Sequence, residues 1–204
     1  MPFDIDAFRS TQNNKNGYIR TNKFHVRFAV PQLMIPDLSV ARDLEFYCQD
    51  IAVPGYQLMT GNVRRWGYGP NESRPFAPNF QQIQLLVNTD GNMDTWNFFQ
   101  QWLSVILPHD ATSGFITSSP RTSGNTYELS YKTEYATDVE ITVFNEVNQE
   151  KKKVFLRESF PSNMNQINLS WGDQNQIAQF TVFMEYLDWY QQAITTTPTQ
   201  TPTQ

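Results

Sequence analysis

The chain has 204 residues, its formal net charge is −5, and only 17% of its residues are charged. Its polar character comes largely from 17 asparagines and 18 glutamines, so a nucleic-acid binder built on a basic patch is not expected. The single cysteine excludes an intrachain disulfide and a cysteine-rich metal site. Aromatic residues make up 14% of the chain and favour strands, and the length suffices for one sizeable β domain or two small ones.

No secretory signal is visible at the N-terminus, and no apolar run approaches the roughly 20 residues that cross a bilayer. We therefore expect a soluble protein made in a cytoplasm, without a membrane partner. Composition changes along the chain predict an N-terminal arm over 1–21, a β domain over 22–190 and a flexible Thr/Pro/Gln tail over 191–204.

The β domain is predicted to begin with a strand over Asn22–Val30, where apolar and polar residues alternate. A second strand is predicted from Asp43 to about Ala52. It places Cys48 on the same face as Leu44 and Phe46, so we interpret this thiol as buried and inert.

Residues 57–79 are predicted to form a long irregular segment, because glycines and prolines interrupt any periodic pattern. A loop of this length inside a compact domain usually has a function. Exposed tryptophan, tyrosine and arginine are enriched at protein interfaces, and this segment contains Arg64, Arg65, Trp66 and Tyr68. We interpret these four residues as a contact site. The alternative is an extended hairpin that packs on its own domain.

The next elements are predicted as a strand over Phe80–Asn88 and one flanking helix from Met93 to about Leu107. Asn92 or Asp90 is placed to cap this helix. One helical stripe would cover an open end or face of the sheet structure. It consists of Trp96, Phe99, Leu103 and Ile106.

Residues 108–126 are rich in serine, threonine and glycine and are predicted to form an inserted surface loop. Strands are predicted near Tyr127–Tyr135, over Asp138–Phe144 and over Lys151–Phe160. The basic triplet Lys151–Lys153 lies opposite acidic residues, which is typical of a charged hairpin tip.

The stretch from Phe160 to Tyr190 is predicted to be one long β-hairpin that turns at residues 172–175. Its inner face is predicted to lie in a core and to carry Ile167, Leu169, Trp171, Ala178, Phe180, Val182, Met184 and Tyr186. Its outer face is polar and carries Gln166, Asn168, Ser170, Gln179, Thr181 and Glu185. Residues 158–204 contain four acids and no basic residue.

Motifs for catalysis, phosphate binding and dinucleotide binding are not found in this sequence. Neither His25 nor His109 has a second ligand at metal-binding spacing. We therefore predict no enzyme activity, no catalytic residue, no cofactor and no metal.

Three segments resemble the tail tube proteins of long contractile-tailed, T-even-like bacteriophages. The first is FYCQDIAVPGY at 46–56, and the second is FQQIQLLVNTDGNMDTWNFFQQWL at 80–103. The third is the predicted hairpin over 160–190, with Leu-Ser-Trp before its turn and Tyr-Leu-Asp-Trp at its end. The loop at 108–126 and the tail at 191–204 are longer than the family pattern requires.

The resemblance implies a mainly β fold, an antiparallel β-barrel or sandwich of the phage tail-tube type with one flanking α-helix. It further implies a structural virion protein whose hexameric rings stack into the inner tail tube, the conduit for DNA ejection inside a contractile sheath. The implied partners are further copies of the chain, the tail sheath protein, baseplate and tail-terminator proteins, and DNA in transit. Assembly would take place in the cytoplasm of the bacterial host.

The outer face of the hairpin, without lysine or arginine, is interpreted as the lining of the lumen, because cations would hold DNA in transit. An ordinary solvent-exposed face is the alternative. Other functions also remain open at this point. They are a baseplate protein that initiates the tube, a bacterial secretion tube, a β-barrel that binds a small ligand, and a barrel that binds single-stranded nucleic acid.

Overall fold

The computed structural model describes residues 4–6, 9–10, 18–31, 34, 38–64, 66–107, 129–172 and 176–192. The helices considered below are α2 (Leu38–Tyr47), α3 (Asp94–Ile106) and α4 (Lys132–Tyr135). The strands are β1 (Phe24–Phe28), β2 (Cys48–Ile51), β3 (Gln57–Val63), β4 (Glu72–Asn79), β5 (Ile83–Asn88), β6 (Thr137–Phe144), β7 (Glu150–Met164), β8 (Gln179–Glu185) and β9 (Asp188–Gln192).

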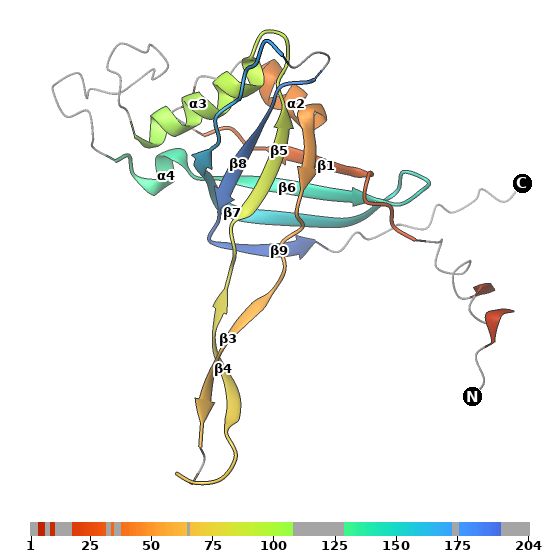
Figure 1. Cartoon of the computed structure of the whole chain (residues 1–204), viewed down its shortest axis with the longest axis vertical. Coiled ribbons are helices and arrows are strands. Elements are labelled where there is room, and N and C mark those ends of the chain that lie inside the picture. The colour runs from red at the N-terminus through yellow and green to blue at the C-terminus, as the bar shows by residue number, and fades with distance from the viewer. Residues whose placement is uncertain are drawn as a thin grey trace, which may run out of the picture.

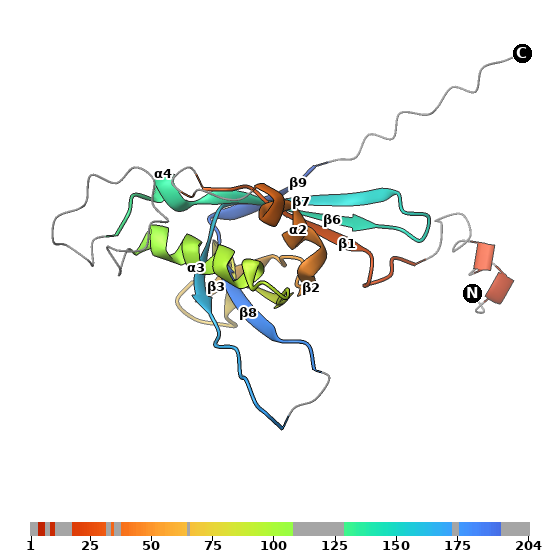
Figure 2. The same cartoon turned by 90° about the horizontal axis from the view of Figure 1, so that it is seen from above.

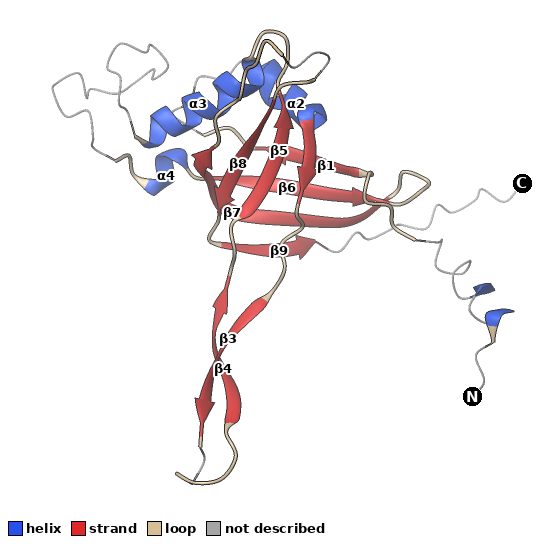
Figure 3. Ribbon diagram, in the orientation of Figure 1, coloured by secondary structure: helices blue, strands red, loops and turns tan. Residues whose placement is uncertain are grey.

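The strands form two layers that share β7. Hydrogen bonding runs in the order β1-β6-β7-β8-β5-β2, and β9 also pairs with β7, while β3 and β4 form a separate two-stranded hairpin. Figure 1 shows that β1, β6, β9 and the first part of β7 cross behind β8, β5 and β2 at a steep angle. All pairings are antiparallel. The fold is therefore mainly antiparallel β, as expected, but it is an open sandwich and not a closed barrel (Figure 3).

A bend in β7 allows this one strand to belong to both layers. Glu158 has a φ of 49°, in the left-handed region, and the β6–β7 register shifts between Thr137 and Val139. The backbone N–H of Glu158 donates to Asp138 Oδ1 at 3.1 Å, and the buried hydroxyl of Ser159 donates to the carbonyl of Thr137 at 2.7 Å. A strand that passes from one sheet to another typically turns at such a bulge.

The core lies between the two layers and is closed by α3. Phe99 of α3 makes edge-on ring contacts with Phe28 of β1 and Phe180 of β8, with centroid distances of 5.8 and 5.9 Å. Trp102 is completely buried, and its indole N–H donates to the carbonyl of Tyr135 at 2.8 Å. The helix thus fills the space between the sheets, which confirms that it covers an open end of the sheet structure.

The buried face of α3 differs from the predicted stripe, which shares only Phe99 with it. The buried residues of this helix are Thr95, Phe98, Phe99, Trp102, Ser104 and Val105. The start of the helix follows one of the two predicted caps. Met93 precedes the helix with a φ of 60° and gives no side-chain hydrogen bond, whereas Asp90 Oδ1 accepts from the backbone N–H and the hydroxyl of Thr95, both at 3.0 Å.

The strand predicted from Asp43 to Ala52 is wrong over its first half, because α2 extends to Tyr47 and β2 begins at Cys48. Leu44 and Cys48, which are one helical turn apart, are buried, whereas Phe46 is 78% exposed. The interpretation of Cys48 is confirmed, since burial, assisted by the charge of Asp50, raises the pKa of its thiol to about 12.

Other predictions are confirmed or corrected by the strand assignments. The strands predicted over Asn22–Val30 and Phe80–Asn88 contain β1 and β5, and those predicted over Asp138–Phe144 and Lys151–Phe160 lie within β6 and β7. The strand predicted near Tyr127–Tyr135 is wrong, because residues 132–135 form α4. The prediction of a single helix is wrong for the same reason and because of α2. The loop predicted at 108–126 and most of the tail at 191–204 lie outside the described residues.

The long hairpin predicted over 160–190 is correct only near its base. Phe160–Met164 pair with β8, and Phe180, Val182 and Met184 are buried, but the β7 strand ends at Met164. Ile167 is only half-buried, while Leu169 and Trp171 are 84% and 105% exposed, so these last two side chains do not lie in the core.

The left-handed backbone at Glu158 makes a prediction about substitutions at the bend. This conformation costs a non-glycine residue roughly 1–2 kcal/mol, and a β-branched residue more. We expect Glu158→Val to lower the free energy of unfolding by about 1–3 kcal/mol relative to Glu158→Gly. Urea unfolding followed by tryptophan fluorescence measures the difference.

Gln84, an exposed residue in the regular part of β5, provides the matched control position. At residue 84 the valine variant should be more stable than the glycine variant, because glycine weakens a strand interior by about 0.5–1 kcal/mol. If valine were at least as stable as glycine at residue 158, the bend would not depend on the left-handed conformation.

The hydrogen bonds at the start of α3 make stability depend on pH. Burial alone raises the pKa of Asp90, but hydrogen bonds from Thr95 and the backbone of Asp94 outweigh it, and the pKa is lowered. The stabilisation is therefore complete above the ordinary aspartate pKa of about 3.9 and is lost as the pH falls through the lower folded-state pKa. We expect Asp90→Ala to reduce the free energy of unfolding by about 1 kcal/mol at pH 7. The difference should narrow in unfolding titrations below pH 4, and an unchanged difference would contradict the assignment.

Candidate functional site

The outer face of the β2–β5–β8 layer is rich in amides and hydroxyls. Register places Asn88, Leu86 and Gln84 of β5 directly opposite Gln179, Thr181 and Phe183 of β8, and directly opposite residues share a face. Their neighbours along the strands, such as Val87 and Val182, are buried in the core. We call this surface the amide face. It consists of Gln49, Asp50, Gln84, Leu86, Asn88, Gln179, Thr181, Phe183 and Glu185.

Amide side chains on this face bind one another across three strands. Gln179 Nε2 donates to Asn88 Oδ1 at 3.0 Å and also to Gln49 Oε1. The strands β2, β5 and β8 contain Asp50 and Glu185 but no lysine or arginine. The amide face therefore offers hydrogen-bonding groups without a fixed positive charge.

Three of the six residues predicted to line a lumen, Gln179, Thr181 and Glu185, lie on the amide face. The other three, Gln166, Asn168 and Ser170, lie beyond the end of β7, outside the strands. Gln166, Asn168, Ser170 and Gln179 nevertheless line one hollow of about 270 Å³ at the end of the layer. Sequence reasoning missed Gln49, Gln84 and Asn88, although the alternation of β5 contained the signal for the latter two.

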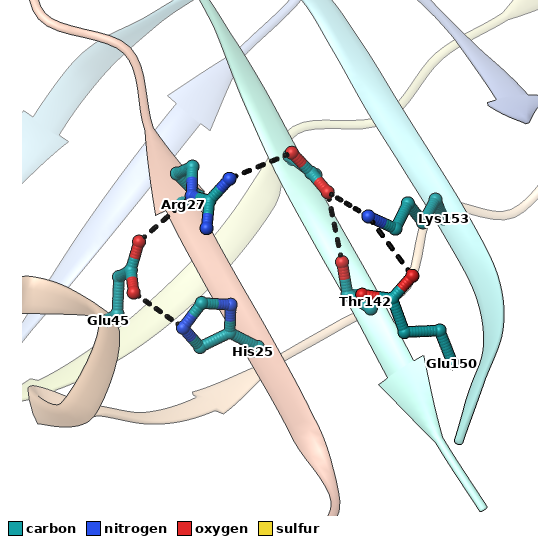
Figure 4. A network of polar contacts seen from close by, with 7 residues as sticks. His25, Arg27, Glu45, Thr142, Glu150 and Lys153 are labelled. Carbon is teal, nitrogen blue, oxygen red and sulfur yellow. Dashed lines mark hydrogen bonds and ion pairs between the residues drawn. The ribbon is translucent and has the colours of Figure 1, made fainter. Parts of the chain in front are cut away.

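The outer face of the other layer, by contrast, carries both charges. Figure 4 shows Arg27 beside Glu45 and Lys153 close to Glu150. Arg27 Nη1 also lies 3.9 Å from Glu140 Oε2. Arg27 Nε lies 3.0 Å from Glu45 Oε1, and Lys153 Nζ lies 3.2 Å from carboxylate oxygens of both Glu140 and Glu150. The predicted charged hairpin tip is confirmed in this ion pair between Lys153 and Glu150.

The cations of this charged face are held by carboxylates. The hydrogen bond and charge of Glu45 raise the pKa of Arg27, and hydrogen bonds to Glu140 and Glu150 raise that of Lys153. Arg157 pairs with Asp188 of β9, and this contact lowers the pKa of Asp188. The two outer faces of the sandwich thus differ in chemistry, one being ionic and balanced, the other amide-rich and without cations.

Two margins of the β2–β5–β8 layer have no partner strand among the described residues. At one margin, β2 pairs only with β5. At the other, Phe160–Met164 of β7 pair with β8 on one side, while pairing with β6 stops at Ser159. Unpaired strand edges expose backbone donors and acceptors and act as templates for further strands.

Residues 57–79 form a hairpin that projects from the sandwich, so the prediction of an irregular segment is wrong (Figure 1). Its base is braced where Trp189 Nε1 donates to the carbonyl of Gly55 at 3.2 Å. Beyond the base, none of the hairpin side chains that the structure describes belongs to the buried core. Its exposed apolar residues are Leu58, Met59, Val63 and Phe76.

The tip of this hairpin holds three of the four residues predicted to form a contact site. Trp66 and Tyr68 are 75% and 78% exposed, and Arg64 Nε donates to Asn71 Oδ1 at 2.8 Å. Arg65 lies outside the described residues. Gly67, with a φ of 74°, supplies the left-handed backbone that the tight turn needs. The turn therefore presents two aromatic side chains to the surroundings.

The described residues contain no cluster of side chains that could hold a metal ion. His25 is engaged by Glu45 at 2.6 Å, and His109 lies outside the described residues. The helices of this part of the chain are all too short or too polar to span a membrane. Backbone edges, an amide face and a projecting aromatic tip are surfaces suited to association.

Comparison with known proteins agrees with this assessment. A family model described as phage tail tube protein matches residues 19–192. No curated protein sequence matches the chain.

Solved structures with the same fold belong to contractile injection systems. The PVC sheath–tube complex in its extended state contains a chain that is 15% identical, with a TM-score of 0.55 and coverage of 91% of this chain and 98% of that chain. A chain of the anti-feeding prophage baseplate is 17% identical, with a TM-score of 0.55 and coverage of 87% and 97%. A chain of the anti-feeding prophage cap is 13% identical, with a TM-score of 0.56 and coverage of 87% and 92%.

At these identities the structures establish a shared fold, and the family model, which spans most of the sequence, establishes kinship. The amide-rich sheet, its open margins and the projecting hairpin are thus features of a protein that belongs to the phage tail tube protein family.

Proposed function

We propose that this chain forms hexameric rings that stack into the inner tube of a contractile phage tail, through which DNA passes. Membership of the tail tube family makes the protein a structural, non-enzymatic component of a phage tail. The observation that carries the finer proposal is the β2–β5–β8 layer, which combines two unpaired margins with an outer face free of cations.

Ring closure would pair the β2 edge of one copy with the Phe160–Met164 edge of the next. Such pairing satisfies backbone groups that are exposed in one copy alone and turns separate sheets into a continuous wall. A heterologous contact of this kind closes into a ring when the rotation between copies fits. Sixfold symmetry is suggested by the anti-feeding prophage baseplate, whose structure is 6-fold symmetrised and contains a chain with this fold.

The amide face would line the lumen. Each lysine or arginine that contacts a phosphate adds affinity for DNA, and several together would slow its passage. Gln179 begins β8 and Thr181 follows it on the same face, where a neighbouring DNA would meet amides, a hydroxyl and the apolar Leu86 and Phe183, but no cation. The charged face around Arg27 and Lys153 would then lie away from the bore.

The hairpin would contact the next ring through Arg64, Arg65, Trp66 and Tyr68. A two-stranded hairpin is marginally stable alone in water, and this one buries almost none of its own surface. Contact with another copy would bury its apolar side chains and order it. The residue types at its tip are those that dominate binding energy at interfaces.

The sheath–tube, baseplate and cap complexes that contain related folds support sheath, baseplate and terminator proteins as partners. Assembly of the phage tail would then take place in the bacterial cytoplasm. A baseplate protein that starts the tube is the second candidate, favoured by the similarity to the anti-feeding prophage baseplate, and copy number per particle separates the two. The open sandwich and the family membership give no support to a ligand-binding barrel.

Electron microscopy of the purified protein tests the assembly. We expect the wild-type chain to form rings and stacked tubes. The Trp66→Ala variant should still fold, but the protein concentration needed to form tubes should rise by at least about tenfold. Truncation of a buried interface tryptophan usually costs about 2 kcal/mol of binding free energy, which is sufficient for this change in concentration.

Phe46→Ala is the matched control, because this aromatic residue on α2 is 78% exposed, close to the 75% of Trp66. It should assemble as the wild type does. A wild-type chain that stays monomeric at all concentrations would refute the tube, and an unfolded Trp66→Ala variant would show that the hairpin serves folding.

Arginines on the amide face test its role in DNA passage. Particles with Gln179→Arg and Thr181→Arg should assemble normally but deliver their genome more slowly, because several cations per ring would hold phosphates, and added salt should relieve the delay. The kinetics of DNA release from purified particles measure the effect.

Glutamates at the same two positions are the control for size, and they should leave the rate of DNA release close to that of the wild type. Equal release from the arginine particles and the wild type would contradict the proposed lining. Equal delays from arginine and glutamate would assign the effect to bulk and not to charge.

A further inference from the structure

The hairpin lies at one end of the β2–β5–β8 layer, and the β7–β8 connection lies at the other end. Ile83, the first residue of β5, follows the hairpin, whereas Asn88, its last residue, pairs with Gln179, where β8 begins. Residues 165–172 and 176–178, which we call the distal loop, therefore emerge at the end opposite the hairpin. Figure 1 shows the hairpin at the bottom and this loop at the top, and Figure 2 shows the loop extending away from the sheets.

The distal loop exposes large apolar side chains that the fold does not use. Leu169, Trp171 and Ile177 are 84%, 105% and 68% exposed. Single exposed apolar residues are ordinary, but these three lie on one projecting loop, and Leu169 and Ile177 line one hollow, so together they mark a candidate interaction site, which we call the patch. The adjoining hollow of about 270 Å³, lined by Leu169, Ile177 and polar neighbours, lies between the two arms of the loop.

The two ends of the layer are also opposite in charge. Residues 57–79 contain three arginines and one glutamate. The distal loop and the adjacent segment 88–94 contain Asp90 and Asp94 and no lysine or arginine. Opposite charges attract the two ends toward one another and disfavour contact between two like ends.

From these observations we propose that the distal loop is the receptor for the hairpin of a second copy of this chain, in a head-to-tail contact along the layer. The aromatic tip around Trp66 and Tyr68 packs against the patch of Leu169, Trp171 and Ile177, while the arginines of the hairpin approach the acidic end. This inference rests on the proposed function, because it assigns the surface that each ring offers to the next.

A head-to-tail contact explains why the chain carries two unlike exposed patches. Such a contact uses a different surface on each copy, so every added copy presents a new receptor, and the assembly continues without closing. A contact between two hairpins or between two distal loops would pair like with like and would stop at two copies.

Site-directed crosslinking tests the contact in assembled tubes. The variant Asn71→Cys/Ser170→Cys, which places thiols at exposed positions beside the two aromatic anchors and keeps Trp66 and Trp171, is allowed to assemble. It is then treated with a short bis-maleimide, which tolerates gaps that a disulfide does not. The native Cys48 does not compete, because it is buried and its thiol pKa is about 12. We expect a ladder of covalent oligomers well beyond the dimer on denaturing gels, whereas either single variant should give at most dimers.

Mixing of truncation variants gives a second readout. Trp171→Ala leaves the folded subunit intact, since this side chain is fully exposed, and it should raise the concentration needed for tubes by at least about tenfold. Trp66→Ala should do the same. A mixture of the two variants retains one good hairpin–receptor pair, so it should form pairs of rings but no long tubes.

The outcomes separate this inference from the proposed function. Tubes of the double cysteine variant that give no ladder, or tubes from Trp171→Ala at the wild-type concentration, would overturn the receptor assignment alone. Normal Trp171→Ala tubes that no longer accept sheath protein would assign the distal loop to the sheath and would also overturn it. A wild-type chain that never forms rings or tubes would instead remove the proposed function.

Discussion

The fold depends on the bend of β7 at Glu158. Before the bend the strand pairs with β6 and β9, and after it the strand pairs with β8, so a single chain segment joins both layers. The bend turns one continuous ladder into two crossing sheets with a core between them. It also leaves the outer side of Phe160–Met164 without a strand, which creates the margin through which we propose that rings close. The feature that completes the core of the monomer thus also leaves the monomer incomplete at its edge.

The two outer faces show how one sandwich serves surfaces with different requirements. The face of β1, β6 and β7 gathers cations, but each of Arg27, Lys153 and Arg157 is paired with a carboxylate. Exposed pairs of this kind contribute little to stability, yet they keep the face soluble and balanced. The amide face achieves solubility without ions. Hydrogen bonding without positive charge is the property that a surface needs if it is to stay wetted beside DNA and not bind it.

Regular alternation or helical spacing made β1, β5, β6, β8 and α3 predictable from sequence. The errors have local physical causes. Leu44, Phe46 and Cys48 alternate as in a strand, but Leu44 and Cys48 also satisfy helical spacing, and burial of that pair decides for α2. Pro75 and Pro78 concealed β4, since proline is excluded from central strands but tolerated on a strand with an unpaired side, and both strands of a two-stranded hairpin have one.

The candidate site was predictable in its chemistry but not in its extent. The amides and hydroxyls of β8 followed from alternation, whereas the contribution of Gln49 depends on a register between β2 and β5 that short-range patterns do not contain. Leu169 and Trp171 continued the alternation and were assigned to a core. The sequence alone could not reveal that the β7 strand ends at Met164, because its end is set by the geometry of the partner strand.

The proposed contact between the hairpin and the next ring has a consequence for assembly. The ordering of flexible residues on binding opposes association, so one hairpin meeting one receptor forms a weak contact. A completed ring presents several hairpins together, and once the first is bound the others bind at high effective concentration. Stacking would therefore be strong between rings and weak between single copies. Lateral pairing through backbone edges would accordingly precede stacking, and a tube would grow by layers from a ring that already exists.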